Sequence, residues 1–244
     1  MLNESHTVLG HTVRVLDLKH LGVDQRGLFR VLKPTFRRIP LDRQDVELLH
    51  YRPEPWRRHA VSGFVLERNK TGAWNVSKKA VAAFTQAVKD KRSTARKFPE
   101  MQASIVSNPE FRKLLVALAN QARELHPSAN AFRFVVHQVR TEATPSLEGH
   151  NSPEQIHQDG NDFVVPALVV NRRGISGGAS EIYSPEKDNP LFQRVLKPGQ
   201  LTIHPDSGPT LQTGIHHHVT GVKTLARVKK GFRDILGFDL DVIR

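Results

Sequence analysis

The sequence contains no cysteine among its 244 residues. This absence excludes disulfide bonds, a thiol nucleophile and structural zinc sites of the cysteine type. Aromatic residues are also scarce, at 7% of the chain, and they do not interleave with basic residues in the way that a platform for stacking nucleic acid bases requires. Metal ligands must therefore be sought among the histidines and the acidic residues.

Long apolar runs are missing as well. The chain has no stretch of ~18 consecutive apolar residues, and residues 1–6 are not a basic flank that leads into an apolar segment. We therefore expect no membrane span, no signal peptide, no membrane partner and a cytoplasmic location. At 27.5 kDa, with 38% hydrophobic residues, the chain has the size and composition of one barrel domain.

The sequence does contain histidine and acid at metal-ligand spacing. In an extended strand, residues i and i+2 point to the same side, so His157 and Asp159 can reach one metal while Gln158 faces elsewhere. His217 follows 58 residues after Asp159 (217 − 159). Two histidines and one carboxylate form a facial triad, which leaves open positions on a non-haem Fe(II). Because the chain has 13 histidines, one such pair can arise by chance, and the argument depends on its companions.

The first companion is the strand-like segment 215–220. Alternation places Ile215, His217 and Val219 on one face, so a ligand buried in an apolar barrel should be His217. A β-bulge would change this parity, and His216 and His218 stay open as alternatives. Three consecutive histidines also fit an exposed polar strand.

The second companion is Arg233, 16 residues beyond His217 (233 − 217). A guanidinium offers a planar set of donors that matches a carboxylate, so a buried Arg233 needs a bidentate anionic partner such as the distal carboxylate of 2-oxoglutarate. Ile235 and Gly237 share its side of the strand and leave room for a small ligand. The alternative is an arginine that pairs with a surface acid.

At these residues the chain resembles the bacterial Fe(II)- and 2-oxoglutarate-dependent dioxygenases that hydroxylate free amino acids, typified by L-isoleucine 4-hydroxylase. The match covers about residues 130 to 240 and rests on segments 136–140, 157–160, 163–170, 177–183, 217–220 and 231–234. Two departures occur, since Gly221 stands where the family usually has proline and His216 precedes His217. Residues 1–60 contain no motif that we can place.

The resemblance implies a complete site. His157, Asp159 and His217 would hold Fe(II), and Arg233 would bind 2-oxoglutarate. The family consumes this cosubstrate and O₂, releases succinate and CO₂, and benefits from ascorbate in vitro. The expected reaction is hydroxylation of an unactivated C–H bond in a free L-amino acid or close derivative. Asp159 favours hydroxylation over halogenation, because radical halogenases of similar fold have a small residue at this position.

The residues that bind the substrate are less well marked. Alternation in the segment 132–140 places Gln138 and Arg140 on one face and His137 on the other. We predict that Arg140 binds the substrate carboxylate, because a free amino acid needs a cationic or donor group there. The polar segment 141–152 leads directly to His157 and is either a lid or an ordinary surface loop.

The net charge of +12 raises the question of a polyanionic partner. The basic residues are spread along the chain, from Arg37 and Arg38 early to Lys229 and Lys230 late, which favours a generally basic surface over a nucleic acid site. Arg227 and Arg233 have the six-residue spacing of the DNA alkylation repair dioxygenases, but the segment between them lacks the polar residues of that motif. Two alternatives to amino acid hydroxylation stay open: an oxygenase that acts on nucleic acid or protein, and a non-catalytic metal-binding barrel.

The rhythm of short apolar runs and turns predicts an α+β, mainly β fold: a double-stranded β-helix (jelly-roll, cupin-like barrel) with N-terminal helices covering the larger sheet. We expect one domain over residues 1–244, with helical and irregular support in 1–130 and the β-helix core in about 131–244. Helices are predicted at 78–92, after a cap at 75–77, and at 109–125, after Asn108. Strands are predicted at 132–142, 163–170, 180–183, 201–204, 215–225 and 233–242.

Overall fold

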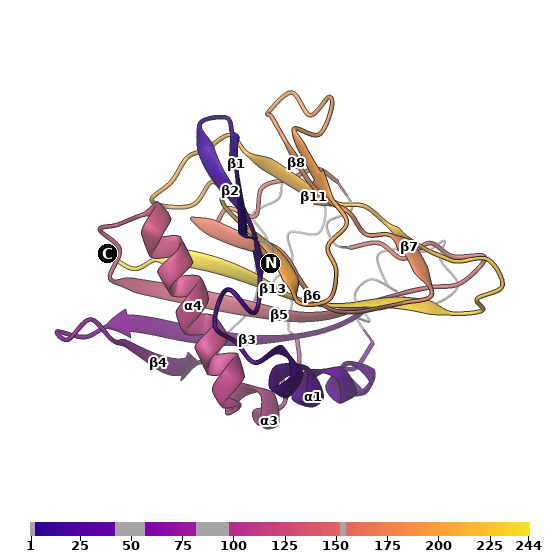
Figure 1. The fold of residues 1–244 in the computed structure, drawn as a ribbon, viewed down its shortest axis with the longest axis horizontal. Helices are drawn as coiled ribbons and strands as arrows, with labels where there is room; N and C mark the ends of the chain where they lie inside the picture. Colours follow the sequence, from indigo (N-terminus) through magenta and orange to yellow (C-terminus); the bar gives the residue numbers. More distant parts are fainter. Residues whose placement is uncertain (1–2, 42–56, 82–97, 152–154) are drawn as a thin grey trace.

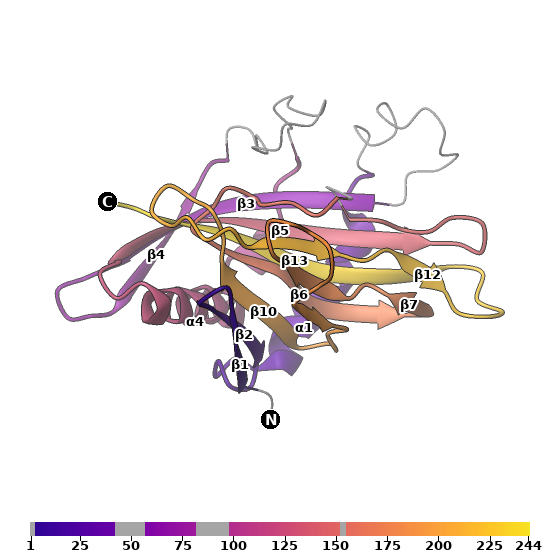
Figure 2. The same ribbon diagram turned by 90° about the horizontal axis from the view of Figure 1, so that it is seen from above.

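An antiparallel sheet of eight strands forms the frame of the molecule. The computed structural model describes residues 3–41, 57–81, 98–151 and 155–244. Within these ranges the strand order is β1-β2-β10-β6-β13-β5-β3-β4 (Figure 1). The strands are β1 (Asn3–Val8), β2 (His11–Asp17), β3 (Arg57–Arg68), β4 (Trp74–Lys79), β5 (Ala131–Ala143), β6 (Phe163–Arg173), β10 (Gln200–Pro205) and β13 (Gly231–Val242). Figure 2 shows β3, β5, β13 and β6 side by side in this order.

Two smaller sheets accompany the large one. The first has the order β11-β8-β9, and the second pairs β12 with β7. Their bounds are β7 (Ile175–Gly177), β8 (Ser180–Tyr183), β9 (Phe192–Arg194), β11 (His216–Val219) and β12 (Val222–Thr224). Ile182 and Ile215 pack with Val139 and Ile235 of the large sheet in one apolar cluster, so the two layers enclose an interior. This architecture confirms the predicted jelly-roll fold.

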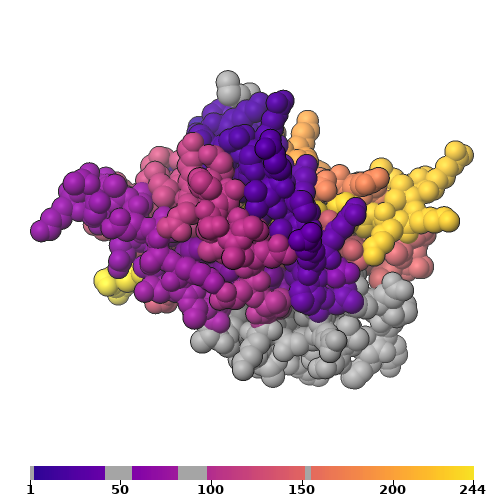
Figure 3. All heavy atoms as spheres, turned by 90° about the horizontal axis from the view of Figure 1, so that it is seen from below, coloured from indigo at the N-terminus to yellow at the C-terminus, as the bar shows by residue number. Residues whose placement is uncertain are grey.

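Helices cover the other face of the large sheet, as predicted. They are α1 (Gln25–Thr35), η1 (Phe36–Arg38), α3 (Ala103–Val106) and α4 (Pro109–Leu125). The Asn108 side chain accepts hydrogen bonds from two backbone N–H groups of the first turn of α4. Pro109, the first residue of the helix, has no N–H group and needs no such acceptor. Phe111 and Leu118 are fully buried against the sheet. In Figure 3 the indigo N-terminal elements and the magenta α4 lie together on this side of the molecule.

The two faces of the sheet have different chemistry because side chains alternate along each strand. In β13, Leu236 and Phe238 belong to the core beneath the helices, whereas Ile235 belongs to the barrel interior. We call the helix-covered side the outer face and the barrel side the inner face. Arg233 and Asp239 share the parity of Ile235 and therefore lie on the inner face.

The N-terminal half of the chain differs from the prediction. Residues 1–130 were expected to supply helices and irregular support, but they contribute β1 to β4 to the large sheet. Segment 75–79 was placed in a helix with its cap, yet it belongs to β4, because Val76 packs on the outer core and the backbone pairs with β3. Residues 82–92 of that predicted helix lie outside the described residues. No helix in the described ranges is long and apolar enough to cross a membrane.

Candidate metal centre

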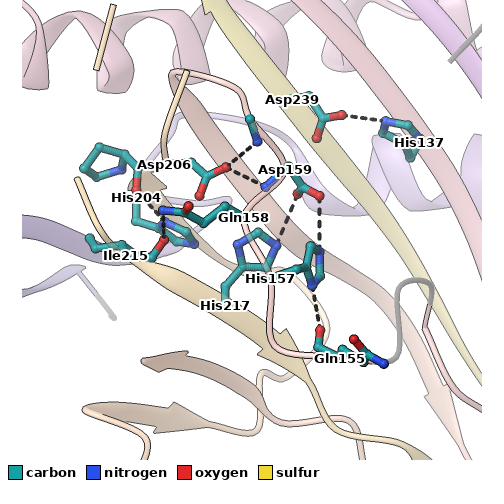
Figure 4. A network of polar contacts seen from close by, with 12 residues as sticks. His137, Gln155, His157, Gln158, Asp159, His204, Asp206, Ile215, His217 and Asp239 are labelled. Atoms are coloured by element: carbon teal, nitrogen blue, oxygen red, sulfur yellow. Dashed lines mark hydrogen bonds and ion pairs between the residues drawn. The ribbon is translucent and has the colours of Figure 1, made fainter. Parts of the chain in front are cut away.

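Three side chains converge in the barrel interior: His157, Asp159 and His217. The backbones of His157 and His217 pair as an antiparallel bridge, in which the distances from the backbone nitrogen to the carbonyl oxygen are 3.0 and 2.8 Å. Directly opposed residues share a face, so both imidazoles point the same way, with ring centroids 4.4 Å apart. Each Nε2 lies 3.2 Å from one carboxylate oxygen of Asp159 (Figure 4). The three ligand atoms lie within 4.8 Å of one another, close enough to hold one metal ion.

The neighbouring histidines have other partners. The Nδ1 of His216 lies 3.0 Å from the carbonyl oxygen of Gly214, and that of His218 lies 2.9 Å from a carboxylate oxygen of Glu181. His217 is 3% exposed, whereas both neighbours are partly exposed. Of the three alternatives in the sequence, the structure brings His217 to His157 and Asp159.

Hydrogen bonds to surrounding groups fix the orientation of the three candidate ligands. A carbonyl oxygen can only accept, so the Nδ1 of His157 donates to Gln155 at 2.7 Å, and Nε2 is the ring nitrogen that faces Asp159. The carboxylate of Asp206 accepts the backbone N–H groups of Asp159 and Gly160, at 2.7 and 3.0 Å. Such supporting contacts hold metal ligands in place.

Gln158 faces away from the three ligand atoms, as strand parity predicts. Its amide donates to the Ser207 hydroxyl at 2.7 Å and to the Ile215 carbonyl at 2.9 Å (Figure 4). These bonds tie the loop that carries His157 and Asp159 to the segment that leads into His217. Gln158 therefore helps to fix the relative position of the two segments that carry the three candidate ligands.

The electrostatics of the cluster favour a cation. Burial alone would raise the pKa of Asp159, but the charges and hydrogen bonds of His217 and His157 outweigh it and hold this pKa well below its usual value. Burial would lower the pKa of His217, yet Asp159 raises it to about 9. The cluster thus retains a proton between carboxylate and imidazole. Because a metal ion competes with protons for such ligands, this donor set fits Fe(II).

Arg233 lies in the same interior and is 1% exposed. Its Nε and Nη2 atoms are buried and have no hydrogen-bond partner within the described ranges. Burial, together with the charge of Arg172 directly opposite on β6, lowers the pKa of Arg233 to about 9. A buried guanidinium costs several kcal/mol when it lacks an anion, so the site is built for an anionic ligand.

The backbone leaves space for that ligand. Gly178 has a φ of +66°, and a Cβ atom there would lie 3.1 Å from the Cδ of Arg233 and 3.1 Å from the Nη1 of Arg172. The Nη1 of Arg172 is also buried without a partner among the residues that the structure describes. Two arginines beside a glycine fit one carboxylate of 2-oxoglutarate.

Arg140 does not join this group, contrary to the role we predicted for it. It lies on the outer face, where its Nε and Nη2 bind both carboxylate oxygens of the buried Asp234 at 2.6 and 2.8 Å. Its guanidinium also covers the ring of Phe232, 4.1 Å from the centroid. Strand parity is the reason: β5 turns His137 toward the interior and Arg140 away from it. This placement argues against contact with a substrate beside His157.

The inner face also carries a chain of polar side chains that no sequence motif indicated. Asp239 accepts a hydrogen bond from the Nε2 of His137 at 3.0 Å, and the Nδ1 of His137 lies 3.0 Å from the Nε2 of His59. Figure 4 shows Asp239 and His137 beside Asp159. Burial raises the pKa of Asp239, and the charge of His137 opposes this shift. Asp239 is separated from Arg233 by an even number of positions in one strand, so alternation alone could have placed both side chains on the same face.

A second missed residue is Arg57, which is 3% exposed. It pairs with Thr141 of β5, and Thr141 in turn pairs with Arg233 of β13. Residues directly opposite in antiparallel strands share a face, so Arg57 lies on the inner face in the same row as Arg233. It falls in a segment where the sequence showed no motif.

A jelly-roll barrel with a His-Asp-His cluster and an arginine that both face its interior is the arrangement of a non-haem iron oxygenase. The chain belongs to the 2OG-Fe dioxygenase family, whose model matches residues 34–239. The cofactors of that family are Fe(II), 2-oxoglutarate and O₂, and the donor set described above fits them. No curated protein matches the chain.

Solved structures share the fold. A bsmA homolog from Methylobium petroleophilum PM1 has a TM-score of 0.74 at 19% identity, over 94% of this chain and 88% of that one. IDO from Bacillus thuringiensis has a TM-score of 0.73 at 16% identity, over 95% and 94%. The Fe(II)/(alpha)ketoglutarate-dependent dioxygenase TqaL has a TM-score of 0.66 at 16% identity, over 95% and 83%. At these identities the likeness concerns the fold alone.

Proposed function

We propose that this Fe(II)- and 2-oxoglutarate-dependent dioxygenase hydroxylates an unactivated C–H bond of a free L-amino acid or close derivative. His157, Asp159 and His217 hold the iron, and Arg233 binds the distal carboxylate of 2-oxoglutarate. The observation that carries the assignment is the buried Arg233, whose donors lack a partner among the described residues and which lies in the same interior as the three ligands. Family membership supports the reaction class.

When bound, the iron supplies the family's oxidative chemistry, in which 2-oxoglutarate and O₂ become succinate and CO₂ and the substrate gains a hydroxyl group. The chain's own contribution is positional. Asp206 and Gln155 fix the directions of the ligand atoms, and the apolar walls around Ile182 and Ile235 exclude water. Excluding solvent protects the reaction from side oxidation.

The charges on the inner face support a zwitterionic substrate. Asp239 is a buried carboxylate beside the metal ligands, and we assign it to the substrate ammonium, with His137 holding its orientation. For the substrate carboxylate we assign Arg57, in the role predicted for Arg140, because Arg57 lies on the inner face. Both roles require contacts that are charge-assisted and therefore strong.

The test is a substrate panel. The protein, Fe(II), ascorbate, 2-oxoglutarate and O₂ are incubated with the common L-amino acids, methylated oligonucleotides and basic peptides, each scored by mass and by succinate. We expect one amino acid to gain one oxygen atom in step with succinate. Oxidation of a polymer with no amino acid turned over would contradict the proposal in favour of a macromolecular substrate. Tight iron binding without succinate from any substrate would indicate a non-catalytic barrel.

A variant tests the substrate contact itself. Asp239→Asn keeps the shape of the side chain but removes its charge, so we expect the KM for the amino acid to rise about 10- to 100-fold, since a hydrogen bond to a charged group contributes roughly 1.5 to 3 kcal/mol. The affinity for 2-oxoglutarate should change little. The control is Asp241→Asn, two residues along the same strand and bound to Asn161. An unchanged KM in Asp239→Asn would remove this assignment.

A further inference from the structure

The outer face contains a second concave site, which the reaction does not use. It is a cleft of about 730 Å³ on the side of the large sheet opposite the metal ligands. Its charged lining consists of Arg37, Arg58, Arg140, Arg173, Lys230 and Glu142. The volume falls within the range of about 300 to 1,000 Å³ that small-molecule sites occupy.

Strand register places the cleft on the outer face. Arg58 lies opposite Arg140, which turns toward the buried Asp234, and Phe232 lies opposite both Glu142 and Arg173. Directly opposed residues share a face, so these strands present the lining together. The cleft is thus separated from His157 and Asp159 by the thickness of the sheet.

Internal carboxylates neutralise only part of this charge. Asp234 takes up the charge of Arg140 through two hydrogen bonds. Glu142 lies 2.7 Å from the Nζ of Lys230 and 3.9 Å from the Nε of Arg58. Among the described residues, the five cations of the lining face two carboxylates, Glu142 and Asp234, which leaves three positive charges. Arg37 and Arg173, both exposed, have no ion pair among the residues that the structure describes.

We propose that this cleft binds a small molecule that carries phosphate groups. A compact ligand with several negative charges matches three excess positive charges in one concavity, and guanidinium groups bind phosphate oxygens in pairs. Arg140, fixed by Asp234 over the ring of Phe232, provides a rigid floor. The volume of about 730 Å³ favours a ligand of nucleotide size over a polymer, which needs a continuous basic track.

The proposal is independent of the substrate assigned above and is tested by direct binding. Inorganic tripolyphosphate and ATP are titrated into the full-length protein at physiological salt by calorimetry, beside single-stranded oligonucleotides of increasing length. We expect both phosphate probes to bind at one site with micromolar affinity. No binding of either probe would overturn the proposal. Affinity that appears only with oligonucleotides, and grows with their length, would also overturn it and indicate a nucleic acid surface.

Single substitutions locate the site. Arg37→Ala and Arg173→Ala should each weaken tripolyphosphate binding about tenfold, because each removes a charge-assisted contact, while leaving the fold intact since neither side chain is buried or ion-paired in the described ranges. The matched control is Lys70→Ala, which removes one exposed charge at the β3–β4 turn, at the other end of the sheet. An equal loss in the control would show diffuse attraction by the basic surface and would contradict a defined site.

Discussion

Arg140 and Arg233 are both buried arginines in adjacent strands of one sheet, and they differ in what the chain offers them. Asp234 directly follows Arg233 in β13, yet its side chain turns to the outer face and binds Arg140 in bidentate fashion. Arg233 points to the inner face, where its Nε and Nη2 meet no acceptor within the described ranges. Arg140 therefore stabilises the fold through an internal ion pair, whereas the donors of Arg233 are available for a ligand.

The difference shows how a binding residue can be told from a structural one. Burial removes both arginines from water, but among the described residues only Arg140 has a protein carboxylate that offsets the desolvation cost. A buried charge without an internal partner is tolerated where a ligand supplies the partner. The metal ligands also lie on the inner face, where His157 and His217 share the carboxylate of Asp159.

The largest expected effect comes from the inner face. His157→Ala, Asp159→Ala and His217→Ala should each abolish succinate formation and sharply reduce bound iron, because two remaining ligands do not fix a facial site. Iron content and turnover are measured on the purified variants. The matched controls are His216→Ala and His218→Ala, which should retain activity. If either control lost activity while His217→Ala kept it, the distal ligand would have to be reassigned.

The second effect separates the two arginines in function. Arg233→Met should raise the KM for 2-oxoglutarate by about one and a half to three and a half orders of magnitude, since truncating one partner of a buried charged pair costs roughly 2 to 5 kcal/mol. Arg233→Lys should recover only part of the loss, because lysine keeps the charge without the paired donors. Iron affinity should remain near that of the unmodified protein. Arg140→Met is the control and should leave the cosubstrate KM unchanged.

The third effect separates them in stability. Arg140→Met should lower the free energy of unfolding by roughly 3 to 5 kcal/mol, because it leaves Asp234 charged and buried without its partner. Arg233→Met should leave this free energy unchanged or raise it in the absence of 2-oxoglutarate. Urea unfolding of the two variants measures the contrast. Equal destabilisation by both substitutions would mean that Arg233 has a structural partner and would weaken its role as a ligand site.

Local patterns predicted those parts of the fold whose signal lies in neighbouring residues. Asn108 and Pro109 marked the start of α4, and apolar runs marked β5, β6, β8, β10 and β13. Strand parity also brought His157 and Asp159 to one side and placed Gln158 on the other. These features depend on residues that are only a few positions apart, so the pattern can be seen in the sequence itself.

The missed features depend on partners far away in the sequence. Strand β2 pairs with β10, and β3 pairs with β5, so neither is stable without a segment that is remote in the chain. The face on which Arg140 lies could not be predicted for a related reason: alternation separates two faces but does not say which one encloses the barrel. His137 and Asp239 meet only once β5 and β13 are paired.

The order of strands in the large sheet also bears on how the protein is made. Residues 14–17 of β2 pair with residues 200–203 of β10, so this edge closes only after most of the chain has left the ribosome. Until then β2 displays unpaired backbone groups, and contacts of such long sequence separation form slowly. We therefore expect the nascent chain to depend on protection from aggregation, and expression at low temperature or with added chaperone should raise the yield of folded enzyme.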